Sequence, residues 1–114
     1  MPRNIIDSVQ GTLDFLILKT LSWGEMHGYA VARWIFDTSG EELQIEEGTL
    51  YPALHRMEDR GWIAAEWGVS ENNRRAKFYH LTPAGRQELA DRVTSWSRFT
   101  RAVNRVLETT PAGA

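Results

Sequence analysis

Hydrophobic residues recur at helical spacing in four segments of this chain, and these segments predict four helices. The expected helices cover roughly residues 10–22, 27–39, 47–60 and 83–107. Two strands are expected between the last two helices, over residues 62–67 and 76–81, with a polar turn over residues 68–74. The pattern therefore predicts a mainly α fold with one small β-hairpin.

Single residues mark where these helices begin and end. Proline lacks an N–H and is tolerated best in the first turn, so Pro52 places the start of the third helix between residues 46 and 49. Gly61 suits the left-handed position just past the end of that helix. Thr82 followed by Pro83 is a strong start signal for the last helix, and His27 is expected to cap the second helix.

The third segment, EEGTLYPALHRMEDRGWI (residues 46–63), is the most informative part of the chain. Leu50, Leu54 and Met57 recur at helical spacing and are expected to face a core. Polar and aromatic residues lie largely on the other faces: Thr49, Tyr51, His55, Arg56 and Arg60. A short helix with such a face, followed by a basic two-stranded hairpin, has the layout of a winged helix-turn-helix.

Charge is distributed unevenly along the chain, although its net charge is only −2. Residues 1–71 hold five Arg or Lys and twelve Asp or Glu, a net of −7, whereas residues 72–114 hold eight and three, a net of +5. A local basic surface, more than overall charge, determines whether a protein can bind phosphate. The second part of the chain therefore remains a candidate for nucleic-acid contact.

The composition favours a soluble cytoplasmic protein. Cysteine is absent, so disulfides and thiolate metal sites are excluded. No apolar run approaches the roughly 20 residues that a membrane span needs, and no signal-peptide core follows the first residues. His27, His55 and His80 are widely spread and form no metal-binding or nucleophile motif, which argues against an enzyme and predicts no cofactor and no metal.

Four motifs follow one another along the chain: GTLDFLILKTL (residues 11–21), HGYAVAR (27–33), EGTLYPALHRMEDRGWI (47–63) and RRAKFYHLTPAG (74–85). In this order they resemble the PadR family of bacterial winged-helix transcriptional regulators. A single long helix after the wing is similar to the small subtype of the family. The resemblance implies a dimeric repressor that leaves its DNA when a small effector or a stress signal arrives.

The resemblance also implies which residues contact DNA. Thr49 and Tyr51 are expected to face the duplex, and His55 and Arg56 continue that face. On the wing, basic and amide side chains are expected to contact the backbone: Asn73, Arg74, Arg75 and Lys77. The alternatives are that Tyr51 packs on the wing, that Arg56 is a solvated charge, and that the wing charges protect a strand edge.

The last helix carries an apolar seam that favours a homodimer over a monomer. Its residues fall on alternating steps of three and four, as in a coiled coil: Leu89, Val93, Trp96, Val103, and then Val106 or Leu107. Two-fold symmetry would place two reading helices on a pseudo-palindromic duplex. The expected organisation is a DNA-binding domain over residues 1–82, a dimerisation helix over 83–108 and a disordered tail over 109–114.

Trp96 has two interpretations in this seam. It is either a packing residue of the dimer interface, which is the commoner case, or a platform for a planar aromatic effector lined also by Phe15 and Phe99. The leading hypothesis is a homodimeric DNA-binding repressor. The alternative is a winged-helix module that senses a ligand or binds a protein without meaningful DNA affinity.

Overall fold

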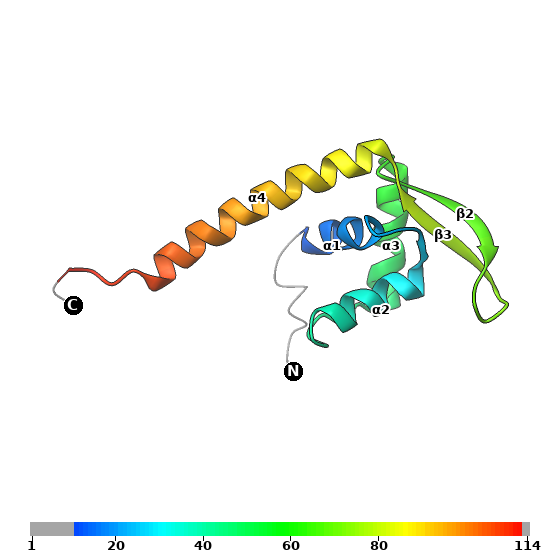
Figure 1. The fold of residues 1–114 in the computed structure, drawn as a ribbon, viewed down its shortest axis with the longest axis horizontal. Coiled ribbons are helices and arrows are strands. Elements are labelled where there is room, and N and C mark those ends of the chain that lie inside the picture. Colours follow the sequence, from blue (N-terminus) through cyan, green and yellow to red (C-terminus); the bar gives the residue numbers. More distant parts are fainter. Residues whose placement is uncertain (1–10, 113–114) are drawn as a thin grey trace.

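The computed structural model describes residues 11–112 and contains four helices and three strands (Figure 1). Their order along the chain is α1 (Thr12–Leu21), β1 (Met26–His27), α2 (Gly28–Thr38), α3 (Glu47–Asp59), β2 (Ile63–Val69), β3 (Arg75–Leu81) and α4 (Pro83–Glu108). The four helices and the hairpin that the sequence predicts are confirmed. We call the hairpin, residues 63–81, the wing.

One hydrophobic core joins α1, α2 and α3 to the base of the wing. Its fully buried side chains include Ile17, Leu18, Val31, Leu54 and Met57. Leu43 and Ile45, in the connection between α2 and α3, pack against this core. This packing fixes the orientation of α3 relative to the wing, which is a winged-helix arrangement.

The sheet contains a short strand that the sequence pattern did not predict. Strand β1 pairs antiparallel with β3, where Met26 lies opposite Tyr79, so the strand order is β1-β3-β2. The wing strands also extend beyond the expected bounds, leaving residues 70–74 as the turn. The longer wing projects away from the helices (Figure 1).

The expected helix caps are present. The Nδ1 atom of His27 accepts a hydrogen bond from the N–H of Ala30 at 3.2 Å, and the hydroxyl of Thr82 accepts one from the N–H of Gly85 at 3.0 Å. Gly61 has φ 77° just after α3. These local interactions satisfy N–H groups that have no partner within the helix, and they define where α2 and α4 begin.

The sequence analysis expected Pro52 in the first turn of the third helix, and this placement is wrong. Helix α3 begins at Glu47, within the expected interval, but Pro52 is its sixth residue and lies in the second turn. Because proline has no N–H, the carbonyl of Gly48 cannot receive the usual helical hydrogen bond from residue 52. The tertiary packing of Leu50 and Leu54 on either side of Pro52 holds the helix through this gap.

Helix α4 extends far beyond the rest of the fold (Figure 1). Its first residues pack on the wing base and α1, and every residue from 101 to 110 is exposed. Residues 109–112 contain no helix or strand. Gln10, where the first helix was expected to begin, and residues 113 and 114 of the expected tail lie outside the described residues, as does the part of the expected DNA-binding domain before residue 11.

Candidate nucleic-acid interface

Helix α3 divides into a buried face and an exposed face. Leu50, Ala53, Leu54 and Met57 are buried in the core. Thr49, Tyr51, His55 and Arg56 are exposed, as the helical spacing predicts. The exposed face is therefore available to a partner outside the fold.

A hollow of about 720 Å³ separates α3 from the wing. Tyr51 and His55 line it from α3, and three predicted wing residues, Arg74, Arg75 and Lys77, line it from the other side. We call it the wing hollow. Thr49 and Asn73 do not line it: Thr49 is exposed near the start of α3, and Asn73 is exposed in the turn of the wing. The fold thus brings five of the eight predicted contact residues around one concave surface.

Tyr51 lies against Gly28, the first residue of α2. A β-carbon added at Gly28 would lie 2.9 Å from Cε1 and 3.1 Å from the hydroxyl oxygen of Tyr51. Because only glycine leaves room for the ring, Gly28 supports the orientation of Tyr51. The tyrosine is still 42% exposed, so its position against Gly28 does not remove it from solvent.

The turn of the wing is held by local hydrogen bonds. Ser70 and Arg74 are joined by a backbone hydrogen bond of 2.7 Å, and the N–H of Asn73 donates to the carbonyl of Ser70 at 2.9 Å. Asn73 has φ 59°, a left-handed conformation that asparagine tolerates better than most residues. These contacts fix the two basic residues that follow, Arg74 and Arg75, at the far end of the wing.

Lys77 is tied to α3. Its ammonium group lies 3.1 Å from the Glu58 carboxylate, and this hydrogen bond raises the pKa of Lys77 above its ordinary value. On the same strand, burial raises the pKa of the Tyr79 hydroxyl. The Lys77 charge is therefore partly balanced within the chain, and its contact holds the wing against α3.

Arg56 also has a partner inside the chain. Its guanidinium lies 2.6 Å from the carboxylate of Asp14 in α1, and Asp14 is only 5% exposed. A buried carboxylate needs such a partner, because an unpaired charge in the interior is costly. Arg56 thus connects α3 to α1, a role that sequence spacing alone does not reveal because the two residues are 42 positions apart.

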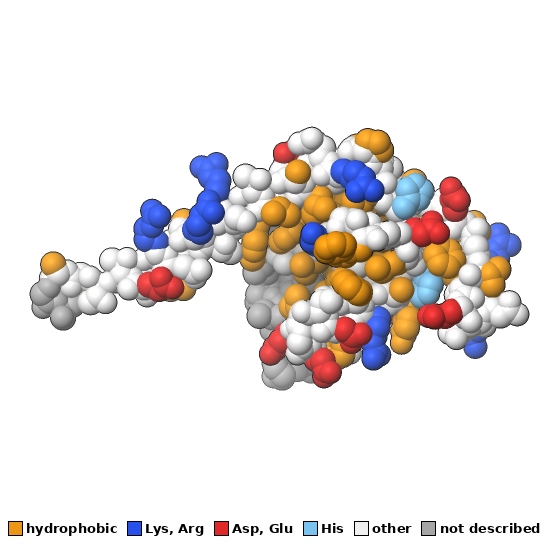
Figure 2. Space-filling view, viewed as in Figure 1, with side chains coloured by type: hydrophobic (Ala, Val, Ile, Leu, Met, Phe, Trp, Pro, Cys, Tyr) orange, Lys and Arg blue, Asp and Glu red, His pale blue; other side chains and the backbone are white. Residues whose placement is uncertain are grey.

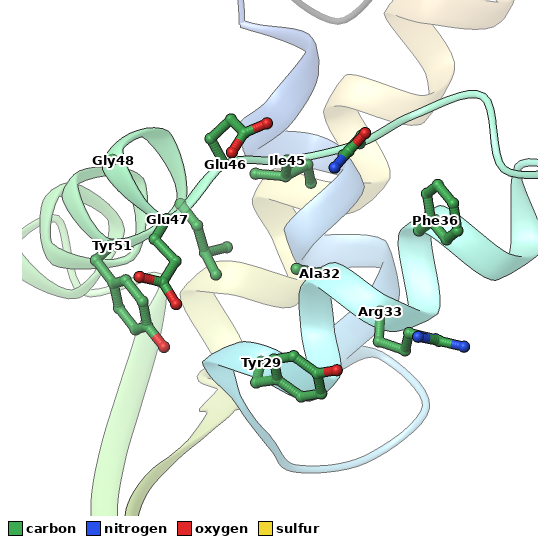
Figure 3. A pocket seen from close by; sticks show the side chains of 11 residues that line it. Tyr29, Ala32, Arg33, Phe36, Ile45, Glu46, Glu47, Gly48 and Tyr51 are labelled. Atoms are coloured by element: carbon green, nitrogen blue, oxygen red, sulfur yellow. The ribbon is translucent and has the colours of Figure 1, made fainter.

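A second hollow, of about 550 Å³, lies between α2 and the start of α3 and was not predicted. Figure 3 shows Glu47 and Tyr51 projecting side by side from α3 and Tyr29 approaching from α2. Glu46 and Glu47 make this edge acidic, whereas Arg33 is paired with Asp37 at 3.2 Å, which raises the pKa of Arg33. The two acidic residues lie at the start of α3, where the helix dipole favours negative charge.

The three aromatic residues predicted to line a ligand site do lie together. The ring centroids of Phe15 and Trp96 are 5.5 Å apart, and those of Trp96 and Phe99 are 6.1 Å apart. They border a shallow hollow of about 360 Å³ between α1 and α4. Packing of α1 against α4 creates this cluster.

The predicted apolar seam of α4 is split between two environments. Leu89 packs against the core of its own chain, and Trp96 is half-buried against Phe15. Val93, which lies between them, is exposed, and so is the apolar stripe beyond them: Phe99, Val103, Val106 and Leu107. On the face shown in Figure 2, basic side chains lie along the arm formed by α4 and acidic side chains are few.

The described residues contain no cluster of three or more histidine or carboxylate side chains that could hold a metal ion. Among the helices between residues 11 and 112, none is long and apolar enough to cross a membrane.

Comparison with known proteins agrees with this geometry. The model of the transcriptional regulator PadR-like family matches residues 17–91. The negative transcriptional regulator PadR of Bacillus subtilis (strain 168) is 30% identical over 79 residues, which are 69% of this chain and 43% of that protein. A transcriptional regulator from Clostridium thermocellum has 30% sequence identity and a TM-score of 0.78, over 87% of this chain and 96% of that one. Bacillus subtilis PadR in complex with operator DNA has 28% identity and a TM-score of 0.66, over 75% of this chain and 48% of that one. The chain belongs to the PadR-like family of transcriptional regulators.

Proposed function

We propose that this protein is a homodimeric regulator that binds a specific DNA sequence, acts as a repressor and is released by a small-molecule effector or a stress signal. The observation that carries the proposal is the wing hollow, where Tyr51 and His55 of α3 face the basic end of the wing. Bacillus subtilis PadR, a member of the same family, was crystallised with operator DNA, which supports the same use of this surface.

Each element has a separate role in this proposal. Thr49, Tyr51 and His55 of α3 enter the major groove, where a helix reads base edges. Asn73, Arg74 and Arg75 contact phosphates, which sets the register of the protein on the duplex. Arg56 and Lys77 already have carboxylate partners, so we assign them to holding α3 in place rather than to the contact set.

The exposed stripe on α4 supports the homodimer. Val106 and Leu107 are 75% and 76% exposed, and burying such a stripe against a second copy is favourable. A two-fold dimer would set its reading helices about 34–36 Å apart, one turn of the duplex. This geometry requires a pseudo-palindromic operator.

The aromatic cluster of Phe15, Trp96 and Phe99 supports an effector site for a planar aromatic molecule. Its place between α1 and α4 would let a ligand bias the packing of the dimerisation helix. Quenching of tryptophan fluorescence by planar aromatic compounds tests this part, and quenching that survives Trp96→Phe would contradict it.

Gel shift with the promoter upstream of the protein's own gene, at two salt concentrations, tests the DNA-binding proposal. Binding should fall steeply with salt, because phosphate contacts release counterions. The second candidate is a sensing or interaction module without meaningful DNA affinity, favoured by the acidic edge of Glu46 and Glu47. No shift on this promoter or on a selected-site library would favour that candidate.

Replacing Arg75 with alanine should weaken binding on all sequences and flatten the slope of log affinity against log salt by about one unit, because one phosphate contact is lost. The matched control is Arg86→Ala, which removes the same charge from the first turns of α4, at the other end of β3. Equal slopes for the Arg75 variant and the wild-type protein would remove Arg75 from the contact set.

Replacing Gly28 with alanine should displace the ring of Tyr51, since the new β-carbon would lie 2.9 Å from it. We expect about tenfold weaker DNA binding, the equivalent of one hydrogen bond to a charged group at about 1.5 kcal/mol. Thermal stability should change little, because alanine is the better helix former. In a Tyr51→Ala background the Gly28 substitution should have no further effect on affinity; an additional loss there would show that Gly28 acts by another route.

A further inference from the structure

Trp67 is an exposed tryptophan on the wing that neither the core nor the predicted contact set explains. It is 60% exposed and lines the wing hollow with Tyr51 and His55. The guanidinium carbon of Arg75 lies 4.8 Å from the centre of its ring. Among the described residues, the interaction that the structure gives this large exposed ring is the cation–π contact with Arg75.

The register of the wing explains how the two side chains meet. Trp67 lies opposite Lys77 and Val69 lies opposite Arg75, so Trp67 and Arg75 are diagonal neighbours on adjacent strands. Alternate residues of a strand share a face, which places Arg75 on the same face as Lys77. Since Lys77 contacts Glu58 of α3, this face of the sheet is directed toward α3.

The chemistry of the guanidinium makes this stack compatible with phosphate binding. The group is planar and weakly hydrated, so its flat face can rest on an indole ring. Its five N–H donors lie in the plane at the edges and stay available for a bidentate contact with phosphate. A stacked arginine also has fewer conformations to lose when it binds, because the ring already restricts a side chain rich in rotamers.

We propose that Trp67 is a positioning residue for DNA binding, which holds the Arg75 guanidinium over the wing hollow with its N–H edges free for a backbone phosphate. This inference rests on the proposed function and adds to it a residue outside the predicted contact set. Trp67 acts through Arg75 and makes no contact of its own with the bases.

The test measures affinity of the full-length variants for the promoter fragment by fluorescence anisotropy. Trp67→Leu removes the ring face and should weaken binding about two- to fivefold, the range of an exposed cation–π contact. Trp67→Phe keeps a ring and should stay within about twofold of wild type. Arg75→Lys keeps the charge but loses the planar stack, so it should weaken binding as much as Trp67→Leu does.

The double variant shows whether Trp67 acts through Arg75. If it does, Trp67→Leu combined with Arg75→Ala should bind as Arg75→Ala alone does. The matched control is Trp23→Leu, because Trp23 is 65% exposed and lies under Lys19 at 4.6 Å but does not line the wing hollow. This control should bind DNA as wild type does.

Two results would overturn the inference while leaving the proposed function intact. The first is a Trp67→Leu or Arg75→Lys variant that binds as tightly as wild type. The second is a double variant in which the two losses multiply instead of overlapping. A wild-type protein that shows no salt-dependent binding to any duplex would instead overturn the proposed function, and this inference with it.

Discussion

Gly85→Ala is expected to destabilise the protein by about 2–3 kcal/mol, near the upper end of the usual cost of overpacking. A β-carbon at residue 85 would lie 1.9 Å from the carbonyl oxygen of Trp62 and 2.9 Å from its carbonyl carbon. That carbonyl cannot simply turn away, because it accepts a hydrogen bond from the N–H of Thr82 at 3.1 Å. The backbone of α4 must therefore shift off the wing base.

Urea unfolding followed by circular dichroism measures this effect. For a domain of this size the loss corresponds to a fall in Tm of roughly 10 °C. Gly48→Ala is the matched control, since a β-carbon there meets nothing within 4 Å and alanine favours a helix. If the two variants unfolded at the same urea concentration, the close crossing at Gly85 would not limit stability.

Gly85 also shows why the first turn of α4 matters for function. Its N–H is held by Thr82, and the absence of a side chain lets α4 cross directly over the residue that precedes β2. The direction in which α4 leaves the body is set at this crossing (Figure 1). In the proposed dimer, that direction determines the spacing of the two reading helices.

Periodic features of the sequence were enough to predict the helices and the hairpin. Leu50, Leu54 and Met57 repeat at helical spacing because they share one buried face. Local chemistry was enough for the caps at His27 and Thr82, whose partners lie three residues away. Strand β1 was missed because two residues are too few to show a period, and its pairing with β3 depends on the fold.

Ion pairs between residues that are far apart along the chain could not be predicted from the sequence. Arg56 had appeared suited to DNA contact because it lies on an exposed face of α3, but its partner, Asp14, comes from another helix. Lys77 likewise meets Glu58 across 19 positions. Neither spacing follows a helical or strand period, so only the packed structure shows which basic residues have a carboxylate partner within the chain.

The end of α4 offers the sharpest test of the proposed dimer. Val103 and Leu107 are one helical turn apart on the exposed stripe, at 36% and 76% exposure, and both lie outside the core of their own chain. Replacing both with glutamate would place like charges against each other across a two-fold interface. The chain should become a monomer by light scattering, while circular dichroism should show that its winged domain is still folded.

Loss of the dimer should weaken specific DNA binding by at least about 10²–10³-fold, because a monomer contacts only one half-site and approaches non-specific affinity. The matched control is the double variant Arg101→Gln with Arg105→Gln, which changes the net charge by the same two units. Its two positions lie on the opposite side of the helix, because each is about half a turn away from residue 103 at 3.6 residues per turn. This control should remain a dimer and keep its affinity. A glutamate variant that keeps the dimer mass would show that the stripe lies outside the interface, and a monomeric variant that binds the operator as wild type does would show that one copy is sufficient.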